Sequence, residues 1–207
     1  MSFPDAREFW NQRFSREDYL FGTEPNVFLA AQAGLLLPGQ RALSLADGEG
    51  RNSVWLAAQG LEVDALEISP VAVDKARVLA AGRGVAPNFH AGDLREWDMG
   101  EARYDIVAAI FIQFLAPAER PAVFARIVRA LRPGGHLILQ GYTPKQVEYK
   151  TGGPPNAENM YTEALLRNAF ADLEILHLQE HEGHLAEGTG HLGWSALIDL
   201  VGRKPER

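Results

Sequence analysis

Apolar positions along the chain alternate between two spacings. Short apolar runs typical of buried strands occur at residues 42–45, 62–67, 88–90, 104–111 and 136–140. Stretches with the three-to-four-residue spacing of amphipathic helices lie between them, at residues 52–58, 70–83 and 117–131. This alternation predicts a parallel sheet with helices on both faces.

The two ends of the chain extend this pattern. Helices are predicted at residues 5–17, 26–37 and 162–170, capped by Asp5, Asn26 and Thr162. Strands are predicted at residues 173–179 and 193–201, joined by a turn region at 183–190. A reversal between adjacent strands implies an antiparallel pair. The predicted fold class is therefore α/β: a single doubly wound, Rossmann-like domain whose seven-stranded sheet is mostly parallel, with an antiparallel C-terminal pair.

Residues 1–207 are interpreted as one domain with four parts. Residues 1–38 form an N-terminal helical cap, 39–142 a ligand-binding core, 143–161 a lid loop, and 162–207 the C-terminal helix and strand pair. Two segments rich in Gly and Pro, Tyr19–Pro25 and Lys145–Pro155, also carry aromatic residues. We expect them to be mobile segments over a binding pocket.

Composition narrows the function classes. The chain has 207 residues, a net charge of −7 and no cysteine, which excludes disulfides and cysteine nucleophiles. No block of Lys and Arg indicates nucleic-acid binding, and no apolar run approaches membrane-spanning length. The N-terminus is charged early and does not resemble a signal peptide. We expect a cytoplasmic monomer or homodimer that binds a small molecule.

Candidate chemistry lies where the predicted parallel strands end, because ligands of such sheets bind outside the carboxyl ends. The first strand ends in Ala46-Asp47-Gly48-Glu49-Gly50, where glycines permit close approach of a ligand. Glu67 ends the second strand, where an acid can accept both hydroxyls of a ribose. Asp93 follows the third strand, and residues 110–114 end the fourth as an apolar wall.

These residues resemble those of class I S-adenosylmethionine-dependent methyltransferases. Ala46–Gly50 resembles the cofactor loop of that family, Glu67 its ribose-binding acid, Gly92-Asp93-Leu94 its adenine-side motif, and Leu131–Gly135 the turn before its fifth strand. The closer resemblance is to small bacterial enzymes of the tellurite-resistance and thiopurine type. It rests on the segments Tyr19–Asn26, Gly48–Asn52 and Gly152–Pro154.

The resemblance implies S-adenosyl-L-methionine as cofactor and S-adenosyl-L-homocysteine as product. The implied cofactor site comprises Ala46, Asp47, Gly48, Gly50, Asn52, Glu67, Ile68, Asp93, Leu94 and Ile110. Ser44 and Ala46 depart from the family pattern, in which an acid and a glycine are common. Ala46 fits the loop with a negative φ, and Asp47 or Glu49 replaces the missing acid toward the ammonium group of the cofactor.

The implied reaction is methyl transfer to a small-molecule acceptor, with a soft nucleophile such as a thiol or a metalloid oxyanion as one class. Substrate-binding candidates are Tyr19, Phe111, Gln113, Tyr142 and His191, with His184 as a further polar candidate. Tyr19 and His191 are the catalytic candidates. We expect His191 at the pocket mouth, at the start of the last strand.

Three other functions remain open. The glycine turn, with Ser53 as a third small residue, also fits an NAD(P)-dependent oxidoreductase, although Asp93 has no role there. A non-catalytic module could bind the cofactor or its demethylated product. A metal site could be built from residues of the C-terminal turn, namely His181, His184, His191, Glu180, Glu182 and Glu187. We interpret that cluster as a polar turn and expect no metal.

Overall fold

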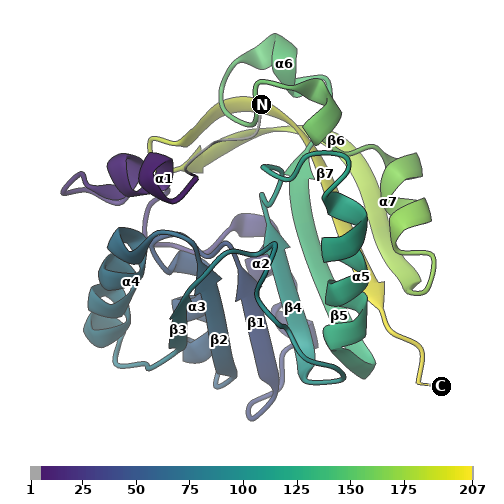
Figure 1. Cartoon of the computed structure of the whole chain (residues 1–207), viewed down its shortest axis with the longest axis horizontal. Helices are drawn as coiled ribbons and strands as arrows, with labels where there is room; N and C mark the ends of the chain where they lie inside the picture. Colours follow the sequence, from purple (N-terminus) through teal and green to yellow (C-terminus); the bar gives the residue numbers. More distant parts are fainter. Residues whose placement is uncertain (1–5, 207) are drawn as a thin grey trace.

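The computed structural model describes residues 6–206 as a seven-stranded sheet with helices on both faces (Figure 1). The strands are β1 Arg41–Leu45, β2 Glu62–Glu67, β3 Asn88–Ala91, β4 Tyr104–Ile110, β5 Leu131–Tyr142, β6 Glu174–Glu187 and β7 His191–Arg203. Their order is β3-β2-β1-β4-β5-β7-β6, and β7 runs antiparallel to both of its neighbours. The predicted fold class is confirmed.

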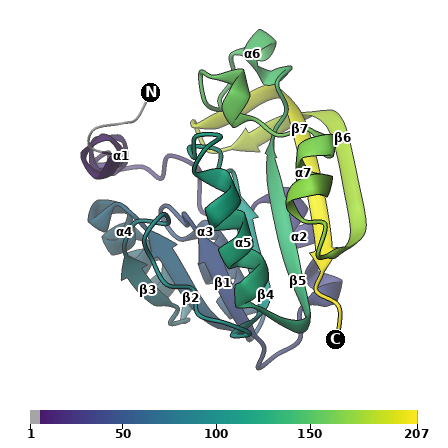
Figure 2. The same ribbon diagram turned by 45° about the vertical axis from the view of Figure 1, so that its right-hand side comes forward.

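Helices cover both faces of the sheet. They are α1 Ala6–Phe14, α2 Val27–Ala31, α3 Arg51–Ala58, α4 Pro70–Arg83, α5 Arg120–Ala130, α6 Gln146–Tyr149 and α7 Glu163–Ala169, with 3₁₀ turns at Ala33–Leu35 and Ala157–Asn159. Helices α5 and α7 lie side by side on one face (Figure 2), and their side chains share a core with Leu43 and Val107. Helices α2 and α3 cover the other face, around Ala42 and Ile106. Among residues 6–206, no helix is both long and apolar enough to cross a bilayer.

Predicted caps fix several helix starts. The Asn26 side chain accepts from Leu29 N, Ser69 Oγ accepts from Ala72 N, and Thr162 Oγ1 accepts from Leu165 N. The predicted caps Asn26 and Thr162 are confirmed, and Ser69 caps α4 in the same way. The predicted cap Asp5 lies outside the described residues.

Three helix predictions were wrong in extent. The first helix ends at Phe14 instead of residue 17. The helix expected from Asn26 to Leu37 breaks after Ala31 into a 3₁₀ turn that contains Gly34, a weak helix former. Helix α5 begins at Arg120 instead of Pro117, because the preceding residues form a turn in which Glu119 accepts from Ala116 N.

Residues 183–190 were predicted as a turn, which is also wrong. Strand β6 continues to Glu187, which pairs directly with His191 across a short turn at residues 188–190. Glycines in this region suggested a long turn, but Gly183 stays in the antiparallel ladder opposite Ser195. The extended hairpin reaches over the C-terminal ends of the parallel strands, toward α1 (Figure 1).

The tip of this hairpin packs against the N-terminal segment. The backbone N–H groups of Thr189 and Gly190 both donate to Leu20 O at 2.9 Å. A methyl group on Gly188 would collide with the backbone of Leu20 and Gly22, so glycine is required there for close approach. This contact joins the first residues of the chain to the last strand pair around a common cavity.

Candidate functional site

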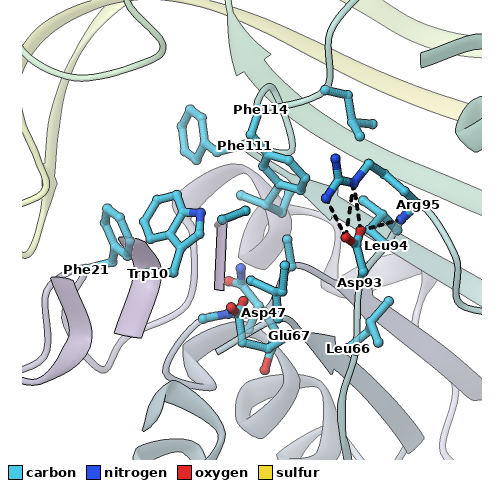
Figure 3. A pocket seen from close by; sticks show the side chains of 18 of the residues that line it. Trp10, Phe21, Asp47, Leu66, Glu67, Asp93, Leu94, Arg95, Phe111 and Phe114 are labelled. Atoms are coloured by element: carbon cyan, nitrogen blue, oxygen red, sulfur yellow. Dashed lines mark hydrogen bonds and ion pairs between the residues drawn. The ribbon is translucent and has the colours of Figure 1, made fainter. Parts of the chain in front are cut away.

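A cavity of about 220 Å³ lies at the carboxyl ends of β1, β2 and β4. Its lining includes residues from the first two strand ends, from β4, from α1 and from the hairpin (Figure 3). Of the predicted cofactor residues, Ala46, Asp47, Gly48, Asn52, Glu67, Ile68, Asp93, Leu94 and Ile110 line it. Gly50 does not line it. A methyl group there would lie 2.6 Å from Ala76 Cβ, so Gly50 allows α3 to approach α4.

Asp47 is held at the cavity by two serines. Ser44 Oγ donates to its Oδ1 at 2.6 Å, and Ser53 donates to it through both its hydroxyl and its backbone N–H. Burial raises the pKa of Asp47, and these hydrogen bonds oppose the shift. Ser44, which stands where the family that the sequence resembles commonly has an acid, therefore supports the carboxylate of Asp47.

Glu49 binds the N-terminal segment instead of facing the cavity. Its carboxylate accepts from Leu20 N at 2.7 Å and pairs with Lys75, and Glu49 is not among the cavity-lining residues. Lys75 in turn donates to the carbonyl oxygens of Arg16 and Asp18. Of the two acids expected to face an ammonium group, Asp47 lies at the cavity and Glu49 fastens the N-terminal segment.

Two cavity residues have left-handed backbone conformations without being glycine. Ala46 has φ +48°, contrary to the negative φ expected for it, and Phe111 has φ +56°. Such conformations cost about 1–3 kcal/mol each and tend to occur at functional sites. Both residues directly follow a parallel strand, so the strain turns the chain at the two strand ends that form the cavity floor.

Glu67 joins the first two strand ends. Its Oε2 accepts from Gly48 N and its Oε1 from Ser69 N, both at 2.9 Å. Burial raises its pKa to about 7, assisted by the negative charge of Asp47 and opposed by these two N–H groups. Each oxygen keeps a second lone pair for a ligand hydroxyl.

Asp93 is already paired. Arg95 donates to its carboxylate through Nη2 at 2.6 Å and Nε at 3.0 Å, and also reaches Glu119 at 3.3 Å (Figure 3). The Arg95 hydrogen bond lowers the pKa of Asp93. Sequence reasoning missed Arg95, although an arginine two residues after an acid at a turn suggests such a pair.

Aromatic rings form the other side of the cavity. The His191 ring lies 4.3 Å from that of Phe111 and 4.4 Å from that of Phe21, between ring centroids. His191 is 8% exposed, so it is buried beside the cavity instead of lying at the mouth as expected. Burial lowers its pKa, which leaves the imidazole neutral near pH 7.

Three predicted acceptor residues do not line the cavity. The Tyr19 hydroxyl donates to Lys75 O at 3.1 Å, away from the site proposed for it. The Gln113 amide binds the backbone N–H and carbonyl of Tyr142. The Tyr142 ring lies behind Phe111, 4.7 Å between centroids, and supports it. None of these residues presents a polar atom to the cavity.

Several lining residues escaped the sequence analysis. Trp10 stacks on Phe14 with 5.4 Å between ring centroids, and both line the cavity, although the sequence predicted only that they lie in a helix. Arg51 and Glu119 also line it, whereas Phe114, another lining residue, belongs to the apolar wall predicted at residues 110–114. Helical spacing of aromatic residues indicates an apolar face but does not show whether that face covers a core or a ligand.

The histidines of the alternative metal site lie apart. His181 pairs with Asp199 at 2.8 Å, His184 packs against Trp194, and only His191 of the three reaches the cavity. Within residues 6–206, no group of three or more His, Asp or Glu side chains could hold a metal ion.

Part of this chain matches a described protein family. Residues 42–135 match the family described as methyltransferase domain. Hemagglutinin 1 of Eikenella corrodens is 26% identical over 80% of this chain and 55% of its own length. Demethylmenaquinone methyltransferase of Renibacterium salmoninarum is 28% identical over 77% of this chain and 68% of its own length. The chain spans about half the length of the first curated relatives it matches.

Solved structures share the fold. A structure described by the conversion of a disulfide bond into a thioacetal group during echinomycin biosynthesis matches with TM-score 0.78 and 20% identity, over 97% of this chain and 92% of that chain. TehB from Haemophilus influenzae matches with TM-score 0.70 and 16% identity, over 96% and 66% of the two chains. Magnesium protoporphyrin IX methyltransferase from Synechocystis, with bound S-adenosylhomocysteine, matches with TM-score 0.71 and 21% identity, over 96% and 97%.

The family match agrees with the enzyme class expected from the sequence, an S-adenosylmethionine-dependent methyltransferase, and the solved structures agree with the expected fold. The matched segment contains both strand ends that carry Asp47 and Glu67. His191 and α1 lie outside it. His191 and Trp10 therefore line the cavity from parts of the chain that the family match does not cover, whereas Phe111 lies within the matched segment.

Proposed function

We propose that the protein transfers a methyl group from S-adenosylmethionine to a small-molecule acceptor. The observation that carries this proposal is the link between Glu67 and Gly48, because it unites a ribose-binding acid and a glycine turn in one cavity. Glu67 would hold the ribose hydroxyls and Asp47 the ammonium group. Arg51 is 6% exposed, and its Nη1 is buried without a hydrogen-bond partner at the cavity, which suits a carboxylate.

The protein's part in the reaction is placement. S-adenosylmethionine, when bound, supplies a methyl group that its positive sulfur already activates. Phe111, Phe21 and Trp10 exclude water and hold a flat or apolar acceptor near the cofactor loop. Neutral His191 can accept a proton from the acceptor, most usefully from a thiol or another soft nucleophile with a pKa near neutrality.

A soft acceptor such as a thiol or a metalloid oxyanion is the substrate class we favour. The aromatic, water-poor wall suits a polarisable nucleophile, and the likeness to TehB supports the tellurite-resistance and thiopurine branch. The likeness to the protein of echinomycin biosynthesis, whose described reaction involves sulfur, points the same way.

Calorimetric titration tests the proposal at the binding step. We expect S-adenosylmethionine and S-adenosylhomocysteine to bind at micromolar Kd, because Glu67, Asp47 and Arg51 converge on one cavity. NADH serves as the matched control. Heat with NADH and none with either sulfur compound would favour the oxidoreductase instead. Binding without turnover across small thiols, metalloid oxyanions and phenols would favour a non-catalytic module.

Hydrogen exchange tests whether Tyr19–Pro25 and Lys145–Pro155 move as lids. We expect amide exchange in both segments to slow when S-adenosylhomocysteine and an acceptor analogue are bound together, because closure would exclude water. In the first segment, Leu20 is bound to Glu49 and to the hairpin tip. The Leu20 amide should therefore exchange slowly both with and without ligands. Low exchange in the free protein along both segments would show that they are structural only.

A further inference from the structure

Glu187, the last residue of β6, lies at the centre of a buried polar cluster beside the cavity. Its Oε1 accepts from Asn26 Nδ2 at 2.9 Å and from Val27 N at 3.2 Å, and its Oε2 lies 2.7 Å from Arg51 Nη2. These partners come from the start of α2 and of α3. Glu187 thus fastens the N-terminal segment to the helix that follows the cofactor loop.

The same Oε2 atom faces His191. His191 Nδ1 lies 3.7 Å from it and is buried without a hydrogen-bond partner. Oε2 is also buried, and its contact with Arg51 Nη2 is an ion pair without good hydrogen-bond geometry. A buried nitrogen without a partner is costly, and the Glu187 carboxylate lies next to this one. A small rotation of the imidazole would close the gap to hydrogen-bond distance, as hydrogen bonds at active sites often tighten when ligands bind.

We propose that Glu187 is a positioning residue that holds the His191 proton on Nδ1, leaving the Nε2 lone pair for the acceptor. A proton on Nε2 would instead set the Nδ1 lone pair against the carboxylate. Since Nδ1 faces Glu187, Nε2 is the nitrogen that remains for the cavity that His191 lines. The proposal rests on the proposed function, because it assigns His191 the role of proton acceptor.

Glu187 also acts on His191 through charge. Burial, together with the positive charges of Arg51 and Arg13, lowers the pKa of His191, whereas Glu187 raises it. Burial disfavours the charged form of Glu187, but His191 and Arg51 outweigh it and bring the Glu187 pKa to about 2. Glu187 is therefore negative throughout the working range. The phenol of Tyr142, whose pKa burial raises, stays neutral beside the pair. Removing the Glu187 charge should make His191 a weaker base.

The first experiment measures the proton directly in the intact protein with S-adenosylhomocysteine. We expect ¹⁵N spectra of histidine-labelled protein to show the Nδ1–H tautomer for His191, whose signal is identified by its absence in His191→Ala. The Glu187→Gln variant should show a lower His191 pKa and some Nε2–H tautomer, since an amide can donate to Nδ1. Predominant Nε2–H in the parent protein would overturn the proposal.

The second experiment measures turnover against pH. We expect Glu187→Gln to lower kcat at least tenfold and to move the acidic limb of the profile to lower pH, with partial recovery in Glu187→Asp. Glu174→Gln, at the exposed start of the same strand, is the matched control. It should leave kcat and the position of the acidic limb unchanged. In a His191→Ala background, Glu187→Gln should have little further effect.

Glu187 would only support the structure if Glu187→Gln lowered kcat equally at every pH and left the acidic limb in place. The same would follow if the effects of Glu187→Gln and His191→Ala were additive. The spectra do not depend on catalysis. A protein that shows the Nδ1–H tautomer but methylates no acceptor would therefore contradict the proposed function and leave the Glu187–His191 pairing intact.

Discussion

Replacing His191 with alanine should lower turnover about 100-fold or more, the usual effect of losing a general base. His191 lines the cavity between Phe21 and Phe111, and burial lowers its pKa below the ordinary value. In the parent protein, the rate should fall as pH drops through that lowered pKa, because protonation removes the lone pair. Steady-state kinetics on the acceptor, with Kd for the cofactor measured separately, checks this.

His184→Ala is the matched control, because His184 packs against Trp194 outside the cavity. It should leave turnover unchanged. Cofactor affinity should be similar in both variants, since neither residue belongs to the cofactor loop. If His191→Ala turns over like the parent at pH values of about 6 to 8, placement alone accounts for the reaction.

Replacing Glu67 with alanine should weaken S-adenosylmethionine binding by about 1.5–3 kcal/mol, roughly ten- to a hundred-fold in Kd. The substitution removes the carboxylate that would hold the ribose and also leaves Gly48 N without its acceptor. Glu67→Gln keeps an acceptor oxygen and should recover part of the loss. Glu62→Gln, at the exposed opposite end of β2, is the control.

The pH dependence of this affinity has a definite sign. Burial raises the Glu67 pKa to about 7, so the carboxylate takes up a proton as the pH falls through that value. The charged form is the better acceptor for hydroxyls, and affinity should therefore decrease below about pH 7. Glu67→Gln should lack this dependence. Parent-like binding by Glu67→Ala would show that the ribose lies elsewhere.

The parallel core and its acids were predictable because their signals are local. Apolar runs fix the strands, Ser69 and Pro70 mark the start of α4, and Glu67 lies where β2 ends. The sheet then brings these strand ends together wherever the surrounding loops go. Most of the predicted cofactor residues line the cavity for this reason.

The acceptor side was harder to predict because it depends on contacts between distant segments. Tyr19 and Gln113 are polar residues in suitable loops, yet their side chains bind the backbone of Lys75 and Tyr142 instead of facing the cavity. The Arg95 pairing, the burial of His191 and the left-handed φ of Ala46 follow from packing that no single stretch of sequence specifies. The glycines at residues 183–190 also led to the prediction of a turn where strand β6 continues.

The docking of the hairpin tip on Leu20 bears on the order in which the molecule folds. Contacts between segments far apart in sequence close large loops, which is entropically costly, so they tend to form after local ones. The βαβ units can assemble from neighbouring segments, whereas the wall containing His191 and Phe21 requires both ends of the chain to meet. In a folding chain, the strand ends that carry Asp47 and Glu67 would thus form before the contact between Phe21 and His191. Local opening at Leu20 would break that contact and leave the strand ends intact.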